Sequence, residues 1–381
     1  MTGKLVFFLP DSKGGVETFT NNYVKSIQGM DMRVVKYKNV EGLSTRIQIQ
    51  RTGHIEQVFI SFSKYATPKS RLKTLLGLVG PNDILVCNDS LELELVNYYG
   101  LKNKVVFILH GDLAHYHNTL GAYRSSVDLV LCVSHGLKNK YGPLFPAIPF
   151  GVSHPFLLDL PVKPAASREK LNCIFIGKFR YLKGADLYLQ TVLSYKGPMN
   201  WTVAAIAYET DQELLDKIPS GVKIYMEQPN EKILEILSDA DILIFPSRTE
   251  GFGIVVLEAM SRGVVPIVLD IPIGIPDQVV HGFNGFIIKE ENWEQANAYL
   301  QQLSGDRALL DRMKNNAIGF VRENFNAALT ATEFITQINA APIRPDKSFD
   351  NRVSTSSDIV PEPIYRGLKF LYNRIKYGKS G

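Results

Sequence analysis

Residues 245–260, reading Phe-Pro-Ser-Arg-Thr-Glu-Gly-Phe-Gly-Ile-Val-Val-Leu-Glu-Ala-Met, hold the strongest chemical pattern in the chain. A buried strand is expected to end at the proline, so Glu250 falls in a loop and Glu258 in the helix that begins near Gly253. Gly251 and Gly253 leave backbone amides open to a sugar and a diphosphate at the helix N-terminus. Two carboxylates in such a loop suit hydrogen bonds from sugar and ribose hydroxyls. The alternative is an acidic capping turn that binds no ligand.

Three basic residues, Lys178, Arg180 and Lys183, lie within the stretch Gly-Lys-Phe-Arg-Tyr-Leu-Lys-Gly at 177–184. The stretch follows an apolar run and precedes a helix-period segment. Lysine supplies a compact charge, and arginine supplies a fork that can bond two oxygens at once. The composition therefore predicts phosphate binding, with a basic solvated loop as the alternative.

Two weaker patterns lie in the first half of the chain. Gly14 and Gly15 stand between an apolar run and a helix-period segment, where glycine lets backbone amides approach an anion. His110 closes a later apolar run and suits a polar contact to a substrate hydroxyl. A plain tight turn and a solvated histidine are the alternatives. No metal site is predicted, because His115 and His117 are two positions apart and do not share a helix face.

The elements that must position these residues alternate between short apolar runs and helix-period stretches. In the first half, strands are expected at 4–9, 33–37, 58–62, 84–87, 105–109 and 129–133, and helices at about 16–28, 69–79, 90–99, 115–125 and 134–141. In the second half, strands are expected at 172–176, 201–206, 222–225, 242–245 and 265–269, and helices at about 184–195, 229–238, 253–262 and 292–304. Two further helical stretches between 306 and 340 close the second half. The alternation predicts an α/β fold with two doubly wound Rossmann-like domains and an interdomain cleft.

The domains are expected at 1–155 and 165–340, followed by a linker and terminal helix at 341–381. Between the domains lies a proline-rich linker with Pro155, Pro161 and Pro164. The three cysteines are widely scattered and lack metal-ligand spacing, which argues against a disulfide framework and fits a reducing compartment.

The start of the chain has only a short apolar run before Pro10, too short for a signal peptide, and no later run reaches the length of a membrane span. The protein is therefore expected to be cytoplasmic. Residues 1–160 carry 17 basic against 12 acidic side chains. This excess suits an anionic partner, such as a phosphate-bearing substrate or an acidic membrane surface, and random scatter is the alternative.

Taken together, these residues resemble the family 4 retaining glycosyltransferases, a large group with the GT-B fold. The specific motif is the glutamate pair, Glu250 and Glu258, within Pro-Ser-x-x-Glu-Gly-Phe-Gly-x-x-x-Leu-Glu-Ala-Met. Nearly the whole chain up to about residue 340 fits. Supporting matches are Gly-Gly at 14–15, His-Gly at 110–111, Pro-Phe-Gly-Val at 149–152, the basic loop at 178–184, Gly-Val-Val-Pro at 263–266 and Gly-Phe-Asn-Gly at 282–285.

The resemblance implies a role for each candidate residue. The Gly15 amide would meet the donor phosphate, and His110 would contact the transferred sugar. Lys178 and Lys183 would neutralise the diphosphate. The family usually has arginine where Lys178 stands, so its phosphate role could be shared with Arg180. A second departure is Ile273, at a position where the family often has a glycine.

The same resemblance implies that Glu250 holds the donor sugar together with the amides after it, and that Glu258 binds the ribose. The residues expected to act in catalysis are His110, Lys178, Lys183 and Glu250. The residues expected to bind the donor are Gly14, Gly15, Lys178, Arg180, Lys183, Glu250, Gly251, Phe252, Gly253, Ile254 and Glu258. The domain at 165–340 would then bind the nucleotide sugar, and the domain at 1–155 would face the acceptor.

The predicted reaction moves a sugar from a nucleoside-diphosphate sugar to a hydroxyl acceptor with retention at the anomeric carbon. The acceptor is expected to be a glycan or a lipid-linked saccharide in cell-surface polysaccharide synthesis. No cofactor, metal or nucleic acid is expected. The alternatives are a nucleotide-sugar epimerase or sugar phosphorylase on the same fold, and a degenerate domain that binds a nucleotide without catalysis.

The end of the chain, residues 364–379, has apolar residues at helical spacing with basic residues on the other face. One interpretation is a basic amphipathic helix that lies on an anionic membrane surface at the inner face of the cell membrane. The other is a terminal helix that packs back on the first domain.

Overall fold

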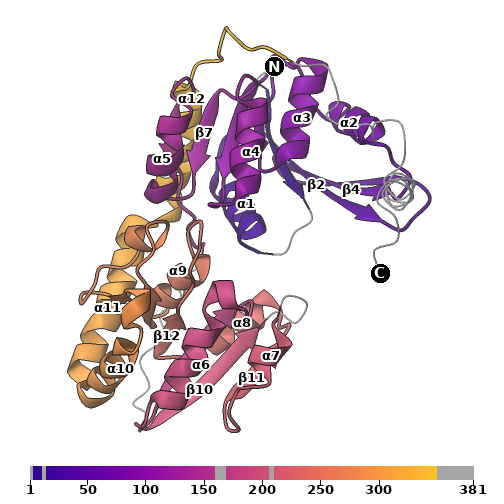
Figure 1. The fold of residues 1–381 in the computed structure, drawn as a ribbon. Helices are drawn as coiled ribbons and strands as arrows, with labels where there is room; N and C mark the ends of the chain where they lie inside the picture. Colours follow the sequence, from indigo (N-terminus) through magenta and orange to yellow (C-terminus); the bar gives the residue numbers. More distant parts are fainter. Residues whose placement is uncertain (1–2, 11–13, 159–168, 206–209, 350–381) are drawn as a thin grey trace, which may run out of the picture. The chain divides into compact units, whose positions relative to one another are not determined.

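The computed structural model describes residues 3–10, 14–158, 169–205 and 210–349. The chain forms two compact units (Figure 1). The first unit comprises the described residues of the ranges Met1–Cys132, Lys140–Gly151 and Ala331–Gly381, and the second unit comprises those of Val133–Asn139 and Val152–Thr330. Residues 133–139 are therefore a short segment of the second unit between two parts of the first.

The first unit is built on an eight-stranded sheet in the order β3-β4-β2-β1-β5-β6-β7-β8. β1 lies between β2 and β5 and pairs with both in parallel, so the order reverses beside it. The apolar runs of the sequence account for these strands, because a strand buried on both faces needs apolar residues throughout. The strands are β1 Leu5–Pro10, β2 Met32–Val40, β3 Arg46–Thr52, β4 Ile55–Ser63, β5 Ile84–Cys87, β6 Lys104–Leu109, β7 Leu129–Cys132 and β8 Phe150–Val152.

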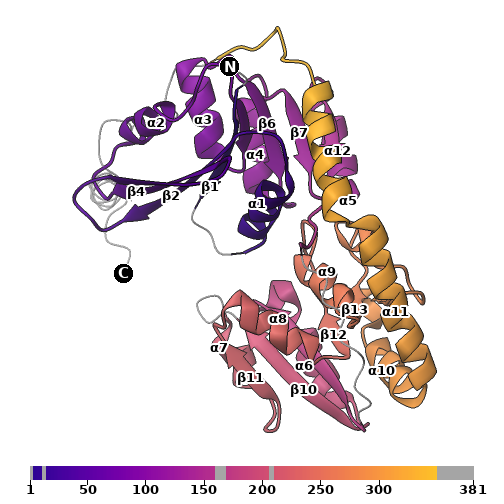
Figure 2. The ribbon, with the colours of Figure 1, turned by 180° about the vertical axis from the view of Figure 1, so that it is seen from behind.

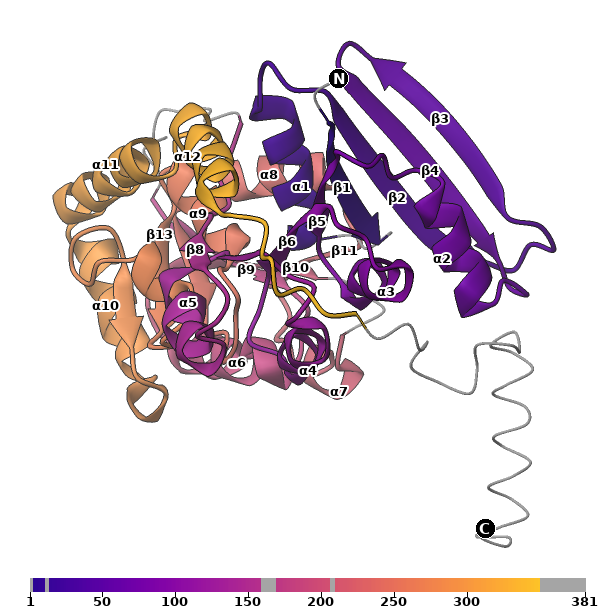
Figure 3. The same ribbon diagram turned by 90° about the horizontal axis from the view of Figure 1, so that it is seen from above.

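Helices cover both faces of this sheet. The first unit contains α1 Gly15–Ser26, α2 Pro68–Leu76, α3 Ser90–Tyr99 and α4 Ala114–Tyr123, and α5 His135–Tyr141 begins in the second unit and ends in the first. Seen from above, α1 and α12 (Ala327–Ala340) lie on one face of the sheet, and α2, α3 and α4 lie on the other (Figure 3). This arrangement confirms the doubly wound α/β sheet.

Most of α12 belongs to the first unit, although the predicted second domain at 165–340 includes the whole helix. Phe334 explains the placement, because its ring stacks on Phe7 at 6.2 Å and packs against Tyr23 at 4.5 Å between centroids. The Lys104 ammonium donates to the Ile338 carbonyl at 2.9 Å. A helix packs where it can bury its apolar stripe, and the chain order does not decide which sheet provides that surface.

Strand β3 is an addition to the predicted elements. It pairs antiparallel with β4, and all seven of its residues are exposed. Its residues alternate Arg-Ile-Gln-Ile-Gln-Arg-Thr, a period-2 pattern that marks an edge strand rather than a buried one. Because β3 contains no continuous apolar run, its sequence did not predict a buried strand.

The second unit, of which Figure 2 labels β10, β11, β12 and β13, has a six-stranded parallel sheet. Its strand order is β11-β10-β9-β12-β13-β14, which reverses between β9 and β12. Of these strands, β14 is an addition to the predicted set. The strands are β9 Leu171–Gly177, β10 Met199–Ala205, β11 Lys223–Met226, β12 Ile242–Phe245, β13 Val265–Leu269 and β14 Phe286–Ile288. The helices are α6 Ala185–Ser194, α7 Gln212–Leu215, α8 Asn230–Ser238, α9 Ile254–Ser261, α10 Gln295–Gly305 and α11 Arg307–Asn324.

The segment after α12 is fixed to the first unit by a buried ion pair. The Lys347 ammonium lies 2.6 Å from the Asp128 carboxylate, and both side chains are almost fully buried. The same carboxylate accepts hydrogen bonds from the backbone N–H groups of Val105 and Arg344. The predicted terminal helix at 364–379 and the prolines Pro161 and Pro164 of the predicted linker lie outside the described residues. In the part of the chain that is described, no helix combines the length and the apolar character needed to cross a bilayer.

Candidate active site

The reversal points of the two sheets show where ligands are expected in such folds, namely beyond the carboxyl ends of the strands on either side. In the second unit these are the ends of β9 and β12. Lys178, Arg180 and Lys183 follow β9, and the loop with Glu250 follows β12. In the first unit, Gly14 and Gly15 follow β1 at the reversal point, and His110 follows β6.

Lys183 and Glu250 form a direct ion pair in the second unit. The lysine ammonium lies 2.6 Å from the glutamate carboxylate and 3.3 Å from the Thr249 carbonyl oxygen. The two side chains are 24% and 13% exposed, so the pair is largely screened from water. The two predicted loops therefore meet, and each holds the charged group of the other in place.

A glycine permits this close approach. Gly184 ends the 3₁₀ turn Tyr181–Lys183 with φ 72°, and a Cβ atom there would lie 2.0 Å from the Pro246 carbonyl oxygen. The position therefore excludes every side chain by contact and by backbone conformation. The second glycine of the basic stretch is what allows the Lys183 turn to pack against the loop after β12.

Arg248 adds a second connection between the same loops. Its guanidinium bonds both oxygens of Asp186 at 2.8 Å and one oxygen of Glu290 at 2.7 Å. The group also lies 3.8 Å from the centroid of the Tyr181 ring. These carboxylates raise the pKa of Arg248 above its ordinary value. A bidentate pair of this kind fixes geometry as well as charge, so Arg248 is a positioning residue for the Lys183 turn.

Glu258 lies in α9, whose last six residues are buried. It is 6% exposed, and burial raises the pKa of its carboxyl group to about 7, against a smaller opposing effect of Arg262. Its backbone carbonyl accepts hydrogen bonds from Ser261 and Arg262. Among the described residues, none donates a hydrogen bond to its carboxylate. Buried polar groups are nearly always paired, so a carboxylate in this state is suited to a ligand that donates hydrogen bonds.

The loop between the two glutamates is held in an unusual backbone conformation. Gly253 precedes α9 with φ 89°, in the left-handed region that favours glycine. Phe252 is buried, and its carbonyl accepts a hydrogen bond from the Gln278 amide at 2.6 Å. Gly274 approaches so closely that a Cβ atom there would lie 2.5 Å from the Phe252 carbonyl oxygen. Gly251 and Ile254 lie in the same stretch, and Ile254 is the first residue of α9.

Lys178 and Arg180 are half-buried at the start of the turn that carries Lys183. The Arg180 backbone N–H donates to the Lys178 carbonyl at 2.9 Å. The predicted residues of the second unit thus lie on two loops at one edge of one sheet and on α9, the helix that follows the second loop.

In the first unit, Gly14 has φ 137°, which favours glycine, and open space surrounds the position of a Cβ atom. Gly15 is the first residue of α1. Residues 11–13, which precede them, lie outside the described residues. Because Gly14 has no side chain, it does not block the approach of a ligand to the backbone amides at the start of α1.

His110 is oriented by Asn88, a residue that the sequence analysis did not single out. The Asn88 amide nitrogen donates to the Phe8 carbonyl, so its oxygen faces His110 Nε2 at 2.6 Å. That oxygen can only accept, so Nε2 carries the proton and Nδ1 holds the lone pair, an assignment that follows from the hydrogen-bond network. Burial lowers the pKa of His110 to about 3, which keeps the ring neutral. The ring can therefore accept a hydrogen bond at Nδ1.

Sequence reasoning missed Asn88, Arg248 and Gln278. Asn88 and Arg248 follow strands at their carboxyl ends, which is the signal that could have identified them. Gln278 follows a short 3₁₀ turn and carries no such signal. Their partners depend on loop contacts between segments up to 80 residues apart.

Comparisons with known proteins agree with the fold. Residues 160–320 match the family model described as glycosyl transferases group 1. An uncharacterized 41.2 kDa protein in the cps region of Klebsiella pneumoniae is 30% identical over 135 residues, which cover 35% of this chain and 36% of that protein. The capsular polysaccharide biosynthesis glycosyltransferase CapM of Staphylococcus aureus is 26% identical over 132 residues, which cover 34% and 33% respectively. The matched stretch thus spans about a third of the length of these relatives.

A solved structure described as trehalose-6-phosphate from E. coli bound with UDP-2-fluoro glucose superposes with a TM-score of 0.70. It is 12% identical in sequence and covers 89% of this chain and 100% of its own, so it supports the GT-B-like fold. Residues 160–320 thus match the glycosyl transferases group 1 family, within a chain that has a GT-B-like fold.

Proposed function

We propose that the chain is a retaining glycosyltransferase that moves a hexosyl group from a nucleoside-diphosphate sugar to a hydroxyl of a saccharide or lipid-linked acceptor. The observation that carries the proposal is Glu258, a buried carboxylate without a hydrogen-bond donor among the described residues, beside the reversal point of the second sheet. A ribose offers two adjacent hydroxyl donors, which match the two oxygens of one carboxylate.

The leaving diphosphate accounts for the basic loop. When the bond between the anomeric carbon and the diphosphate oxygen breaks, negative charge develops on the phosphates. Fixed cations stabilise this charge in the transition state. In our proposal Lys183 and Lys178 supply them, and the backbone amides at Gly253 and Ile254 add the positive end of α9.

Glu250 has two roles in this proposal. It accepts hydrogen bonds from hydroxyls of the donor sugar, and it holds the Lys183 ammonium in place before the donor arrives, as the 2.6 Å ion pair supports. The acceptor oxygen attacks the anomeric carbon from the side on which the diphosphate leaves, and the acceptor proton passes to a diphosphate oxygen. This route keeps the configuration at the anomeric carbon and needs no covalent nucleophile.

His110 is assigned to the transferred sugar. Its Nδ1 lone pair is suited to accept from a sugar hydroxyl, because Asn88 engages the Nε2 proton and burial keeps the ring neutral. Gly14 and Gly15 are assigned to the donor phosphate through their backbone amides. The CapM relative supports a role in capsular or another cell-surface polysaccharide, with a growing glycan or a lipid-linked saccharide as acceptor.

The first experiment is a thermal-shift panel of uridine and guanosine diphosphate sugars on the purified full chain. A bound donor stabilises the folded state by mass action, and about 2.7 kcal/mol is expected at 100 times the Kd. The matching donor should raise the Tm of the wild type and shift Glu258→Gln much less. No shift with any donor for the wild type contradicts the proposal.

Nucleotide release then separates catalysis from binding. The expected result is a nucleoside diphosphate produced only when a saccharide acceptor is added, together with an extended acceptor that carries an α or β linkage identical to that of the donor. Donor binding without release identifies a non-catalytic nucleotide-binding domain. Conversion of the nucleotide sugar without an acceptor identifies an epimerase.

We also propose that transfer needs no metal ion, since lysines neutralise the diphosphate. Activity should survive EDTA. Loss of transfer in EDTA that is restored by magnesium or manganese would argue against the lysine assignment.

A further inference from the structure

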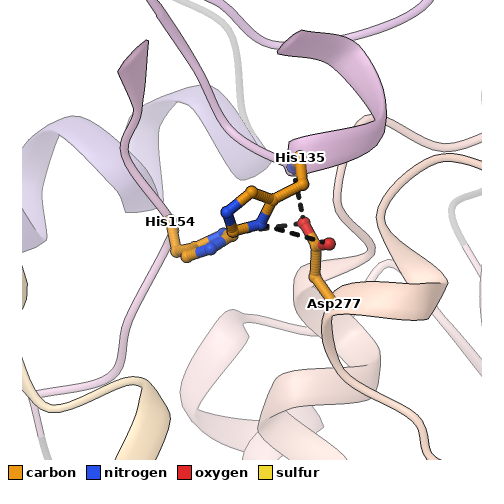
Figure 4. Close-up of side chains that lie close together, drawn as sticks. All are labelled: His135, His154 and Asp277. Atoms are coloured by element: carbon orange, nitrogen blue, oxygen red, sulfur yellow. Dashed lines mark hydrogen bonds and ion pairs between the residues drawn. The ribbon is translucent and has the colours of Figure 1, made fainter. Parts of the chain in front are cut away.

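Two histidines and an aspartate gather in the second unit, apart from the residues assigned above (Figure 4). His135 begins α5, His154 lies two residues beyond the end of β8, and Asp277 ends the 3₁₀ turn Ile275–Asp277. One ligand atom from each residue lies within 4.8 Å of the other two. The three segments are far apart in the sequence, and all three residues belong to one unit.

The carboxylate of Asp277 is the centre of the cluster. It is 9% exposed and accepts a hydrogen bond from the His135 backbone N–H at 2.8 Å. Its oxygens also lie 3.5 Å from His135 Nδ1 and 3.8 Å from His154 Nδ1. Capping the first turn of α5 explains the backbone contact. It does not explain why two imidazole rings, 5.1 Å apart between centroids, are directed to the same carboxylate.

His154 already has the second partner that a metal-binding histidine usually has. Its Nδ1 lies 3.2 Å from the Val133 carbonyl oxygen, which can only accept, so Nδ1 carries the proton and Nε2 is the nitrogen that would bind a cation. Because Nδ1 is also the nitrogen that lies 3.8 Å from Asp277, the ring must turn to present Nε2 to that cation. A backbone carbonyl in this position orients the ring of many ligating histidines and fixes the tautomer. His135 is 61% exposed, which gives an ion access to the cluster from solvent.

We propose that His135, His154 and Asp277 bind a late first-row divalent cation, with Zn²⁺ as the best match. Two imidazole nitrogens and one carboxylate oxygen are ligands that zinc prefers, and a water molecule can complete a tetrahedral site. Ligands about 2.1 Å from zinc lie roughly 3.4 Å from one another, so atoms that lie within 4.8 Å of one another must approach by up to about 1.4 Å. The exposed His135 ring can make most of this adjustment.

The cation would connect segment 133–139 and the chain after β8 to the loop that holds the glutamate pair. The His154 ring packs against Phe252 and Phe325, at 5.6 and 5.5 Å between centroids. Gln278, the residue after Asp277, donates to the Phe252 carbonyl. Zinc would therefore stabilise the second unit and the loop around Phe252. It would be a structural ion, so it is compatible with transfer in EDTA.

The first test is a calorimetric titration of ZnCl₂ into the full chain after removal of metal with EDTA and dialysis. We expect one zinc per chain, and a Kd at least about ten times higher in His135→Gln, in His154→Gln and in Asp277→Asn. Asp277→Asn keeps an oxygen that can accept from the His135 N–H, so α5 retains its cap. His115→Gln is the matched control, because His115 pairs with Asp89 and, among the described residues, belongs to no group that could hold a metal ion. This control should bind zinc as the wild type does.

The second test needs no variant, which covers the case in which a substitution unfolds the chain. X-ray absorption at the zinc edge of the wild type should show two imidazoles and oxygen ligands. The three cysteines are fully buried and are not expected to contribute sulfur. The proposal is overturned if the wild type takes up no zinc, or if the spectrum shows thiolate sulfur or fewer than two imidazoles. It is also overturned if the three cluster variants are folded and bind zinc as tightly as the wild type does.

Discussion

Both units bury a glutamate on the helix that follows the strand beside the reversal point. Glu92 lies on α3 after β5, and Glu258 lies on α9 after β12. Burial raises the pKa of each carboxyl group to about 7. Glu92, however, accepts hydrogen bonds from the Tyr37 hydroxyl and from the Asp89 backbone N–H. Among the described residues, Glu258 has no corresponding donor.

The difference shows that burial and a raised pKa do not identify a ligand-binding carboxylate. Glu92 belongs to a capping box with Asp89 that closes the N-terminus of α3, so its partners are provided by the protein. Burial raises the pKa of Glu258 to a similar value, but none of the described residues donates a hydrogen bond to its carboxylate. Positions of this kind are retained for binding more readily than for stability.

The largest effect concerns stability as a function of pH. Because the folded-state pKa of Glu258 lies above its ordinary value of 4.5, the folded chain holds this proton more tightly than the unfolded chain. Stability is therefore lost as pH rises from about 4.5 to about 7. A glutamine at this position does not titrate, so its contribution to stability does not change with pH. Across this pH range the free energy of unfolding of Glu258→Gln should therefore rise by about 3 kcal/mol relative to that of the wild type.

Urea unfolding across this pH range measures the effect, with fluorescence as the probe. Both tryptophans, Trp201 and Trp293, belong to the second unit, so their emission reports that unit. Glu92→Gln in the first unit should keep the wild-type pH dependence of the tryptophan signal. A constant difference between Glu258→Gln and the wild type at all pH values would mean that the Glu258 carboxylate is not buried in solution.

The next effect concerns the leaving group. Lys183→Ala and Lys178→Ala should each slow transfer about a hundredfold, or roughly 2.7 kcal/mol, the usual scale for a lost transition-state donor. Lys183→Ala also leaves Glu250 without its ion-pair partner. Lys178→Arg should remain active, because arginine also contacts phosphate.

Single-turnover transfer rates measure these changes, and Lys223→Ala is the matched control, since Lys223 is exposed on β11 of the same unit. An inactive but folded Lys178→Arg enzyme counts against a phosphate contact at this position. Wild-type rates in both alanine variants remove the basic loop from the mechanism.

Donor affinity provides the direct comparison of the two buried glutamates. Loss of a charged hydrogen bond costs roughly 1.5–3 kcal/mol, so Glu258→Ala should weaken donor binding by about 10- to 150-fold. Glu92→Gln should leave the donor Kd unchanged and lower the Tm, since it disturbs the Tyr37 and Asp89 contacts. Glu250→Ala should mainly lower turnover. Calorimetric titration with donor decides, and equal donor affinities for wild type and Glu258→Ala refute the ribose assignment.

A smaller effect is expected at His110. Asn88→Ala removes the acceptor for the Nε2 proton, so the ring loses its fixed tautomer, and turnover should fall about 2- to 10-fold. Because Asn88 acts through His110, the double variant with His110→Ala should be no slower than His110→Ala alone. Additive losses in this double-mutant cycle would show that Asn88 has a separate role.

The sequence predicted most of the fold because the buried strands are continuous apolar runs. Strand β5 and strand β12 have the predicted bounds, and the glycines at the loops fall where close approaches occur, as at Gly184. Strand β3 and the packing of α12 on the first sheet were not predicted. An exposed edge strand lacks an apolar run, and the surface that an amphipathic helix covers depends on tertiary packing.

The candidate residues themselves were readable from type and spacing, whereas their partners were not. The sequence indicates charges at Lys183 and Glu250 but not that they pair, because the pairing depends on how two loops approach at one sheet edge. The same is true of Asn88 and His110. The cluster of His135, His154 and Asp277 was also missed, since its members lie up to 142 positions apart.

The smallest and most salt-sensitive effect concerns the predicted helix at 364–379, which lies outside the described residues. We propose that it lies on an anionic membrane surface, where each of its basic residues contributes at most about 1 kcal/mol.

The structure indicates where to truncate the chain to test this proposal. A chain that ends near residue 341 loses Lys347 and leaves the buried Asp128 without its cation, which typically costs about 3–5 kcal/mol. A chain that ends at Phe349 keeps that pair and the cation–π contact of Phe349 with Lys102. Flotation with phosphatidylglycerol vesicles should recover the full chain at low salt and much less of the chain that ends at Phe349, with little recovery of either on phosphatidylcholine or in high salt. Equal flotation of the two chains, or unfolding of the one that ends at Phe349, would instead support a helix that packs on the protein.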